Sequence, residues 1–387
     1  MTPLPTARLP LESLPPRAVY VHLPFCARQC PYCDFPTAPL SRELEARYLD
    51  ALAAELDRRA PAGLRARTVF LGGGTPSELT SAGIARLVEL LGPICRPARE
   101  VTLEANPRTL LPRKLAALRA GLGVNRLSLG AQSFSPRLLE RLGRVHRPDD
   151  VARAAAVARE AGIASLNVDL MFGIEDQTEA ELLADIAAAV ALGPDHLSLY
   201  SLTIEPGTPF AAARAAGTLR HPGQARQARL FARARRALRA AGFEHYEVSN
   251  FARPGRRCRH NQVYWRNHPY LGLGNGAASH LDGERCSNLR DPGAYAAAVL
   301  SGASPVAERE RLEPARKLRE TAYLALRTSE GVVRARFLRE CGVDPFVALG
   351  PELERLERQG LVRRHERRAW LTGRGVSLAD RVGVEVL

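Results

Sequence analysis

The 387-residue sequence has no apolar run long enough to span a membrane. Residues 2–16 are polar and proline-rich and lack the apolar segment of a secretory signal peptide. A disulfide framework is also not indicated, because the seven cysteines make an odd total and four of them, at positions 95, 258, 286 and 341, are scattered. These absences favour a cytoplasmic protein.

Lysine is nearly absent: Lys114 and Lys317 are the only two, so arginine carries the net charge of +14. The arginines are interspersed with acidic residues along predicted helices, as in 352–358, which is typical of solvated helix faces. We therefore do not expect a nucleic acid as the partner, despite the pI near 10.1. The composition, 45% hydrophobic and 25% charged, is that of a globular protein of two or three domains.

Strand and helix patterns alternate six times in the first half of the chain. The predicted strands are separated by amphipathic helices, two of which begin at the capping residues Ser41 and Thr178. The short links predict a parallel sheet with outer helices, either a partial β/α barrel or an open doubly wound sheet. The predicted strands cover residues 18–23, 68–71, 101–104, 126–129, 165–170 and 196–202.

The alternation stops near Gly207, and the second half has a different organisation. A long arginine-rich helix is predicted over 223–241, a linker-like stretch over 304–311, and then helices followed by two short strands and a last helix. This end resembles a winged helix, but no basic recognition helix is evident, so we favour a lid or docking domain over a DNA-binding one. We divide the chain into a disordered or loosely packed leader (1–17), a β/α core (18–210), an extension (211–303) and a C-terminal domain (304–387).

Three cysteines, Cys26, Cys30 and Cys33, fall within eight residues directly after the first predicted strand. Such compact spacing is what a metal ion or cluster needs. Three thiolates can hold three irons of a four-iron cluster and leave the fourth iron open to a small molecule. The alternative is one zinc ion held by the three cysteines and His22, although structural zinc sites usually draw on two separated pairs of ligands.

Polar residues and glycines lie where other predicted strands end. Glu104, Gln132 and Asp169 each lie at or just beyond the end of a different strand, and the strand at 68–71 runs into Gly72-Gly73-Gly74-Thr75-Pro76. In parallel β/α folds these strand ends share one face. Glycines there would let a ligand approach the backbone. The sequence therefore predicts one pocket next to the cysteine loop.

These motifs resemble the radical S-adenosylmethionine (SAM) superfamily and, within it, the anaerobic coproporphyrinogen oxidase family. The order and the spacing of the motifs both agree, from about Tyr20 to the C-terminus. The resemblance implies a partial (β/α)6 barrel with a small α-rich, winged-helix-like C-terminal domain. Besides the cysteine run, with Tyr32 before its last cysteine, the matching motifs are Gly72–Pro76, Glu104-x-Asn106-Pro107, residues 125–134 (NRLSLGAQSF) and residues 167–171 (NVDLM).

The resemblance also implies a role for each candidate residue. The three cysteines would ligate a [4Fe-4S] cluster, and SAM would chelate its open iron. The expected neighbours of that SAM are Tyr20, Gly73, Gly74, Thr75 and Glu104. The adjoining part of the cavity, where coproporphyrinogen oxidases hold a second SAM, would be lined by Gln132, Arg144 and Asp169. The alternatives are an internal ion pair among Glu104, Arg144 and Asp169, and a Gln132 that only bonds to a strand-end carbonyl.

Two features favour the HemW branch of this family, whose members are regarded as heme chaperones. Phe35 stands where similar coproporphyrinogen oxidases carry a fourth cysteine, and only 25 residues precede Cys26. Residues 260–265 (HNQVYW) also match that branch. The branch implies His260 as a candidate ligand of heme iron, with Tyr264 and Trp265 against the porphyrin. The alternative is a hydrogen-bonded structural His260.

The resemblance thus implies a protein that binds heme and passes it to acceptor proteins such as respiratory enzymes. The alternative function is enzymatic: oxygen-independent oxidative decarboxylation of coproporphyrinogen III, with SAM as the radical source. The radical-SAM residues are present for either function, and Phe35 argues against the decarboxylation. A homodimer is compatible with the sequence.

Overall fold

The computed structural model describes residues 7–61 and 63–387. Its centre is a nine-stranded sheet in the order β7-β8-β6-β5-β4-β3-β2-β1-β9. Strands β1 to β6 and β9 run parallel to one another, whereas β8 is antiparallel to both of its neighbours, β6 and β7. The nine strands are β1 (Ala18–Leu23), β2 (Thr68–Gly73), β3 (Glu100–Ala105), β4 (Arg126–Gln132), β5 (Ser165–Phe172), β6 (His196–Ser201), β7 (Glu244–His245), β8 (Asn250–Ala252) and β9 (Leu271–Leu273).

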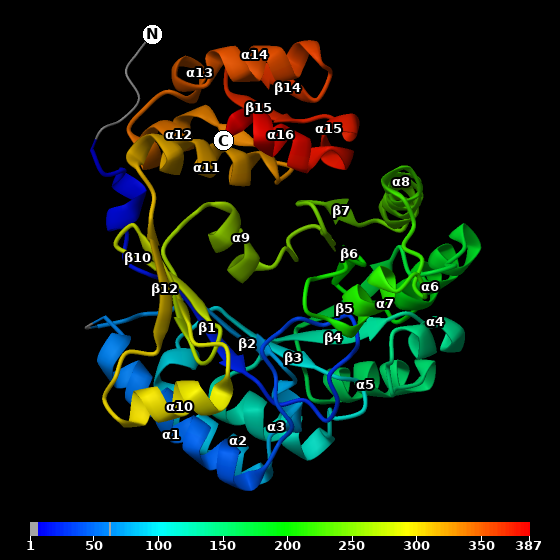
Figure 1. The fold of residues 1–387 in the computed structure, drawn as a ribbon, viewed down its shortest axis with the longest axis vertical. Helices are drawn as coiled ribbons and strands as arrows, with labels where there is room; N and C mark the ends of the chain where they lie inside the picture. The colour runs from blue at the N-terminus through cyan, green and yellow to red at the C-terminus, as the bar shows by residue number, and fades with distance from the viewer. Residues whose placement is uncertain (1–6, 62) are drawn as a thin grey trace.

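The strand order decides between the two predicted architectures. Strands β1 to β6 follow one another without a reversal, so right-handed crossovers place every connecting helix on the same face of the sheet. A doubly wound sheet would need a reversal, and the prediction of a partial six-stranded barrel is therefore confirmed (Figure 1). The connecting helices are α1 (Arg42–Arg59), α2 (Ser81–Cys95), α3 (Pro112–Leu122), α4 (Pro136–Arg141), α5 (Pro148–Glu160) and α6 (Glu179–Ala191).

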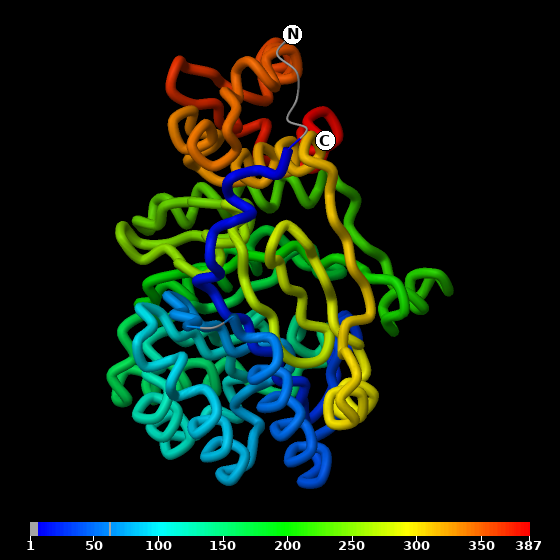
Figure 2. The backbone as a smooth tube through the Cα atoms, turned by 90° about the vertical axis from the view of Figure 1, so that its left-hand side faces the viewer, coloured from blue at the N-terminus to red at the C-terminus, as the bar shows by residue number. Residues whose placement is uncertain are grey.

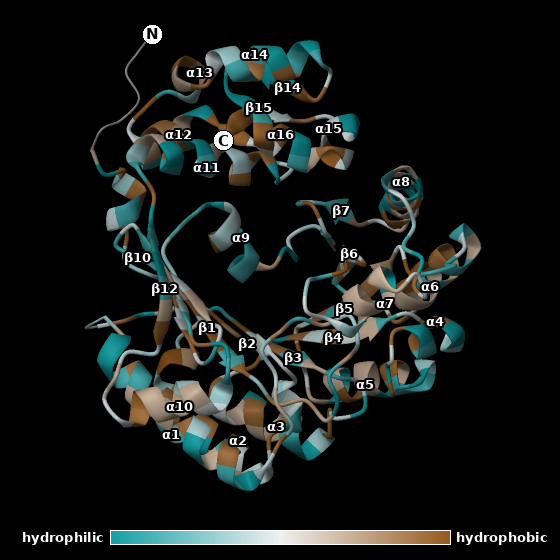
Figure 3. Ribbon diagram, viewed as in Figure 1, coloured by the Kyte–Doolittle hydropathy of each residue, from teal (hydrophilic) through white to brown (hydrophobic). Residues whose placement is uncertain are grey.

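Local sequence signals define these helices, and burial of their apolar sides holds them on the sheet. The Ser41 hydroxyl accepts a hydrogen bond from Leu44 N, and Thr178 and Glu181 form a reciprocal capping box at the start of α6. α3 ends at Gly123, in the left-handed region at φ 72°. Hydrophobic residues line the strands and the helix sides turned toward them (Figure 3), and Leu71 and Leu103 have no exposed surface.

The extension adds helices and a second sheet. Helix α9 (Arg259–Trp265) lies on the concave side of the sheet, between the barrel and the C-terminal domain (Figure 1). β10 (Ala278–Leu281), β11 (Glu284–Asn288) and β12 (Val306–Arg311) form an antiparallel sheet. The remaining helices here are α7 (Pro209–Ala215), α8 (Gln224–Ala240) and α10 (Pro292–Leu300), of which α8 confirms the predicted arginine-rich helix.

The C-terminal domain has the order helix, strand, helices, strand, strand of a winged-helix-like domain, as expected. Its three-stranded sheet has the order β13-β15-β14. No helix in the described part of the chain is long and apolar enough to cross a bilayer. The elements are α11 (Pro314–Leu326), β13 (Val332–Val333), α12 (Arg334–Cys341), α13 (Pro345–Ala348), α14 (Gly350–Arg358), β14 (Val362–His365), β15 (Arg368–Leu371), α15 (Gly373–Ser377) and α16 (Ala379–Val386).

The expectation of a disordered or loosely packed leader is wrong for the part of 1–17 that the structure describes; residues 1–6 lie outside it. A 3-10 helix, η1 (Pro10–Ser13), forms there, and the Glu12 side chain accepts a hydrogen bond from Leu9 N at 2.7 Å. Leu9 and Leu11 are buried in the core of the C-terminal domain. The leader therefore runs from that domain down to β1 (Figure 2).

The stretch 304–311 is also not the linker that its composition suggests. It contains β12, which pairs with β11 from Glu284–Arg311 to Asn288–Val306. Charged residues that resemble a linker in sequence are here the exposed side chains of an edge strand, held by main-chain hydrogen bonds. β12 then continues up to the C-terminal domain (Figure 1).

Candidate functional site

One cavity of about 630 Å³ opens at the carboxyl ends of the parallel strands. This is the face where β/α folds place their ligands. The predicted pocket is confirmed as a geometric feature, because ten of the twelve candidate residues line it. They are Cys26, Cys30, Cys33, Gly73, Gly74, Thr75, Glu104, Gln132, Arg144 and Asp169.

The cysteine loop that follows β1 forms one wall of this cavity. Cys26 Sγ lies 3.4 Å from Thr75 Oγ1, and Arg144 Nη1 lies 3.6 Å from Cys30 Sγ. Burial raises the pKa of the Cys26 thiol, and it raises that of Cys33 to about 11. Without a metal these thiols hold their protons, so iron binding has to displace them.

The loop fits a cluster better than a single ion. Within residues 7–61 and 63–387, no three His, Cys, Asp or Glu side chains converge on one ion-sized site. His22 is also not free to complete a zinc site, since Nδ1 lies 3.1 Å from the Tyr20 hydroxyl and Nε2 lies 3.1 Å from Pro36 O. A four-iron cluster binds each thiolate to a different iron and so accepts the wider spacing.

The glycine run is required by the protein's own packing. A Cβ on Gly73 would lie 2.4 Å from the His22 ring, and the residue has φ 102°. A Cβ on Gly74 would lie 2.6 Å from the Pro24 carbonyl carbon, and one on Gly72 2.6 Å from Glu104 Oε2. The three glycines thus let β2 approach the cysteine loop and Glu104 closely, and Gly73 and Gly74 still line the cavity.

Two carboxylates lie in the cavity wall. Glu104 Oε2 accepts a hydrogen bond from Gly73 N at 3.1 Å, and Asp169 accepts bonds from Ser128 and Asn167 at 3.0 and 2.7 Å. Burial, with the charge of Asp169, raises the pKa of Glu104 to about 7. Two acidic groups in one buried cavity favour a ligand with ammonium groups, which would compensate their charge, or with hydroxyl groups, which would donate hydrogen bonds to them.

Arg144 does not form the internal ion pair that was the alternative. Its Nη2 donates to Gly130 O at 2.8 Å, while Nη1 faces Cys30. No ion pair joins Arg144 to Glu104 or Asp169 in the described chain. Gln132 follows a bulge in β4 and has φ 64°, so a strained backbone directs it at the cavity. Arg144 thus has no carboxylate partner in the described residues, and both Arg144 and Gln132 line the cavity.

The remaining two candidates, Tyr20 and His260, do not line the cavity. The Tyr20 hydroxyl is bonded to His22 beneath the wall. His260 contacts Thr68 at the start of β2, whereas Gly73 is at the other end of that strand, about 17 Å away at the usual rise per residue. His260 Nδ1 lies 2.9 Å from Thr68 Oγ1 and Nε2 lies 2.8 Å from the Tyr264 hydroxyl. These two contacts match the alternative of a hydrogen-bonded structural histidine.

We expect His260→Ala to unfold more readily and still bind hemin as the wild type does. The substitution removes two hydrogen bonds and the contact of the ring with Phe70, at a cost of roughly 2–4 kcal/mol. Thermal denaturation and a hemin titration measure the two effects. If His260→Ala does not fold, Tyr264→Phe can be used in its place, because it removes only the hydrogen-bond partner of His260 Nε2. Loss of hemin binding in either folded variant would restore His260 as the ligand.

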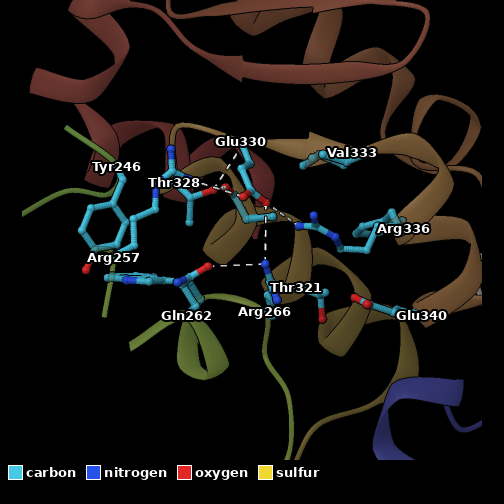
Figure 4. Close-up of a pocket in the computed structure, with 15 residues that line it drawn as sticks. Tyr246, Arg257, Gln262, Arg266, Thr321, Thr328, Glu330, Val333, Arg336 and Glu340 are labelled. Carbon is cyan, nitrogen blue, oxygen red and sulfur yellow. Dashed lines mark hydrogen bonds and ion pairs between the residues drawn. The ribbon is translucent and has the colours of Figure 1, made fainter. Parts of the chain in front are cut away.

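A second pocket, of about 40 Å³, lies between α9 and the C-terminal domain (Figure 4). Its Glu330 carboxylate is 2.7 Å from Arg336, 3.4 Å from Arg257 and 3.9 Å from Arg266, which ties the extension to the domain. Trp265 lines this pocket, under the Arg327 guanidinium. The space holds a few water molecules at most, so the aromatic end of HNQVYW borders no porphyrin-sized cavity.

Some residues in or near the cavity were not predicted from the sequence. Arg126 does not line the cavity, but it is only 3% exposed at the start of β4, and its charge acts against the burial-raised pKa of both Glu104 and Asp169. The sequence could have indicated this role, because Arg126 lies two residues before Ser128 and therefore on the same inward face of the strand. Several residues that do line the cavity were also missed, among them Arg28, Tyr32, Glu78, Arg108, Val145, Met171 and Tyr200.

The partial barrel and its cysteine-walled cavity are those of the radical SAM superfamily. Residues 20–189 match the Radical SAM superfamily, and residues 312–378 match the HemN C-terminal domain. Superfamily membership implies a [4Fe-4S] cluster and SAM. The structure of Escherichia coli coproporphyrinogen III oxidase (HemN), described as a radical SAM enzyme, is similar with a TM-score of 0.83 and 25% identity, over 97% of this chain and 91% of that chain.

The relatives in sequence show to which branch of the superfamily the chain belongs. A heme chaperone HemW of Mycobacterium tuberculosis is 39% identical over 95% of this chain and 94% of its own length. That of Bacillus subtilis is 34% identical over 95% of this chain and 98% of its own. This chain belongs to the HemW family.

Proposed function

We propose that this protein is a cytoplasmic heme chaperone that binds heme and passes it to an acceptor protein, such as a respiratory enzyme. The observation that carries the proposal is the likeness, along nearly the whole chain, to relatives named heme chaperone HemW. Phe35 supports it, because this position lacks the thiol expected in a coproporphyrinogen-decarboxylating relative.

The cavity residues supply the binding chemistry for the resident cofactors. Cys26, Cys30 and Cys33 hold the [4Fe-4S] cluster, which supplies reducing electrons when bound. Glu104 and Asp169 accept hydrogen bonds from the ammonium or ribose groups of SAM, and Arg144 suits a carboxylate. The Gly73 and Gly74 backbone leaves room for the ligand beside Thr75. Gln132 supplies amide donors at the adjoining end of the cavity.

The alternative function is oxygen-independent decarboxylation of coproporphyrinogen III. It is favoured by the shared fold of the Escherichia coli oxidase. The same cavity residues would hold the cluster and SAM for either function. What separates the two functions is the fate of the tetrapyrrole: carried unchanged, or oxidised.

We expect the anaerobically reconstituted protein to bind hemin at about one per chain and to form no protoporphyrinogen IX. Hemin binding is followed by the Soret band, and product formation from coproporphyrinogen III, SAM and a reductant by chromatography. A mixture without protein is the blank. Product above that blank would contradict the chaperone assignment, and so would the absence of a stoichiometric Soret change.

A further inference from the structure

We propose that heme lies flat across the mouth of the cluster cavity, with its propionates on Arg28 and Arg108. This site rests on the proposed function and gives it a location. We call the surface the cavity rim and define it by Arg28, Phe35, Arg108, Val145 and Tyr200, all of which line the cavity.

Three members of the cavity rim are large, partly exposed hydrophobic or aromatic side chains. Phe35 is 56% exposed, Val145 45% and Tyr200 42%. Large apolar side chains that stay in water on one rim are typical of a ligand-binding surface. Two aromatic rings also suit the flat face of a porphyrin, because offset stacking adds to the burial of apolar area.

The charges of the cavity rim match the propionates of heme. Arg28 and Arg108 are exposed, and neither is within ion-pair distance of an acidic side chain in residues 7–61 and 63–387. Arg108 Nη1 donates to Val145 O at 3.2 Å, which places this cation against the apolar part of the rim. A planar guanidinium binds a carboxylate with two parallel hydrogen bonds. Heme offers two such carboxylates on one edge.

The size of the cavity places heme on the rim and not inside. About 630 Å³ is within the range of sites that hold one drug-sized molecule. The cluster and SAM occupy this space in a radical SAM protein, so a porphyrin has to lie above them. Heme on the cavity rim would then close the mouth and shield the cluster from solvent.

This placement gives a role to Phe35. The residue follows the cluster loop by two positions and points its ring to the rim, where it remains largely exposed. A cysteine there would offer the porphyrin little apolar area, whereas phenylalanine adds an aromatic surface. Phe35 therefore adds to the cavity rim an aromatic surface on which a tetrapyrrole can lie.

The test is a hemin titration of the reconstituted full-length protein and of Arg28→Glu/Arg108→Glu. We expect the double variant to bind hemin at least about tenfold more weakly, through the loss of two charge-assisted contacts. Heme dimethyl ester, which has no carboxylates, should bind both proteins alike. The matched control is Arg229→Glu/Arg236→Glu on α8, which makes the same change in net charge at exposed arginines away from the rim.

A second measurement uses the cluster. Hemin bound to the wild type should slow the bleaching of the cluster by a chelator, and Phe35→Ala should weaken hemin binding without a change in iron content. Equal hemin affinity of wild type and Arg28→Glu/Arg108→Glu would overturn the site, and so would unprotected iron in the heme-loaded protein. Wild-type protein that binds no hemin would instead contradict the proposed function, and the rim site with it.

Discussion

Serine in place of Cys26, Cys30 or Cys33 should reduce the iron bound after anaerobic reconstitution from about four atoms per chain to a small fraction of that. Each thiolate would hold a different iron, and a serine hydroxyl does not replace it because it is far less acidic than a thiol and its oxygen is a harder ligand than sulfur. Two cysteines alone do not retain a cluster of this kind. SAM binding should be lost together with the iron, since the open iron is its anchor. Iron analysis and the visible absorption of the cluster measure the effect.

Cys286→Ser is the matched control for these variants. Cys286 is half-buried and does not line the cavity, and its Sγ accepts a hydrogen bond from Arg59 that a serine oxygen can also accept. This variant should keep the full iron content. A full cluster in any one of the three loop variants would remove that cysteine from the ligand set.

Glu104→Gln should weaken SAM binding by roughly ten- to a hundredfold, because it removes a charged acceptor from a buried cavity. In the wild type the pKa of Glu104 is about 7 in the folded protein. Binding of SAM through the carboxylate should therefore strengthen as the pH rises from 6 to 8. The glutamine variant does not titrate, so its weaker affinity should lack this component of the pH dependence.

The same substitution should stabilise the protein without ligand. Burial raises the pKa of Glu104 from 4.5, so the unfolded chain ionises first and the wild type loses stability as the pH rises from about 4.5 to 7. Above that range the loss is complete, and glutamine should recover of the order of 2 kcal/mol at pH 8.

SAM titrations and thermal denaturation at pH 6 and pH 8 separate the two effects of Glu104→Gln. Glu140→Gln, at an exposed acid on α4, is the control for the change in charge. Unchanged SAM affinity of Glu104→Gln at both pH values would exclude Glu104 as a contact. A melting temperature equal to that of the wild type at pH 8 would exclude the raised pKa.

The parallel core could be predicted from the sequence because local sequence patterns define each β/α unit. Caps such as Ser41 and Thr178 and the apolar periodicity define the helices, and handedness then leaves one arrangement for consecutive strands. The short strands were missed because they lack such local signals. β9 has only three residues, and its Gly272 is needed because a Cβ there would lie 1.9 Å from Ala278 O. Nothing in its own sequence indicates pairing with β1.

The location of the site could be predicted because topology brings strand ends together, whatever the details of packing. The roles of single residues were harder to predict. His260 looked like a ligand, yet its neighbours Thr68 and Tyr264 satisfy both ring nitrogens. The glycine run suggested access for a ligand, while its closest constraints are His22 and the Pro24 backbone. Such contacts join distant parts of the chain, so no local sequence pattern indicates them.

The packing of the leader has a consequence for the order in which the chain folds. Leu9 and Leu11 complete a core whose other members, such as Leu318 and Phe337, lie in the distant C-terminal domain. Residues 9–11 thus find their partners only when these distant residues are present, while the barrel between them can form from neighbouring units. Deletion of residues 8–13 would then damage the far end of the molecule and spare the barrel. The two ends of the polypeptide close the fold together.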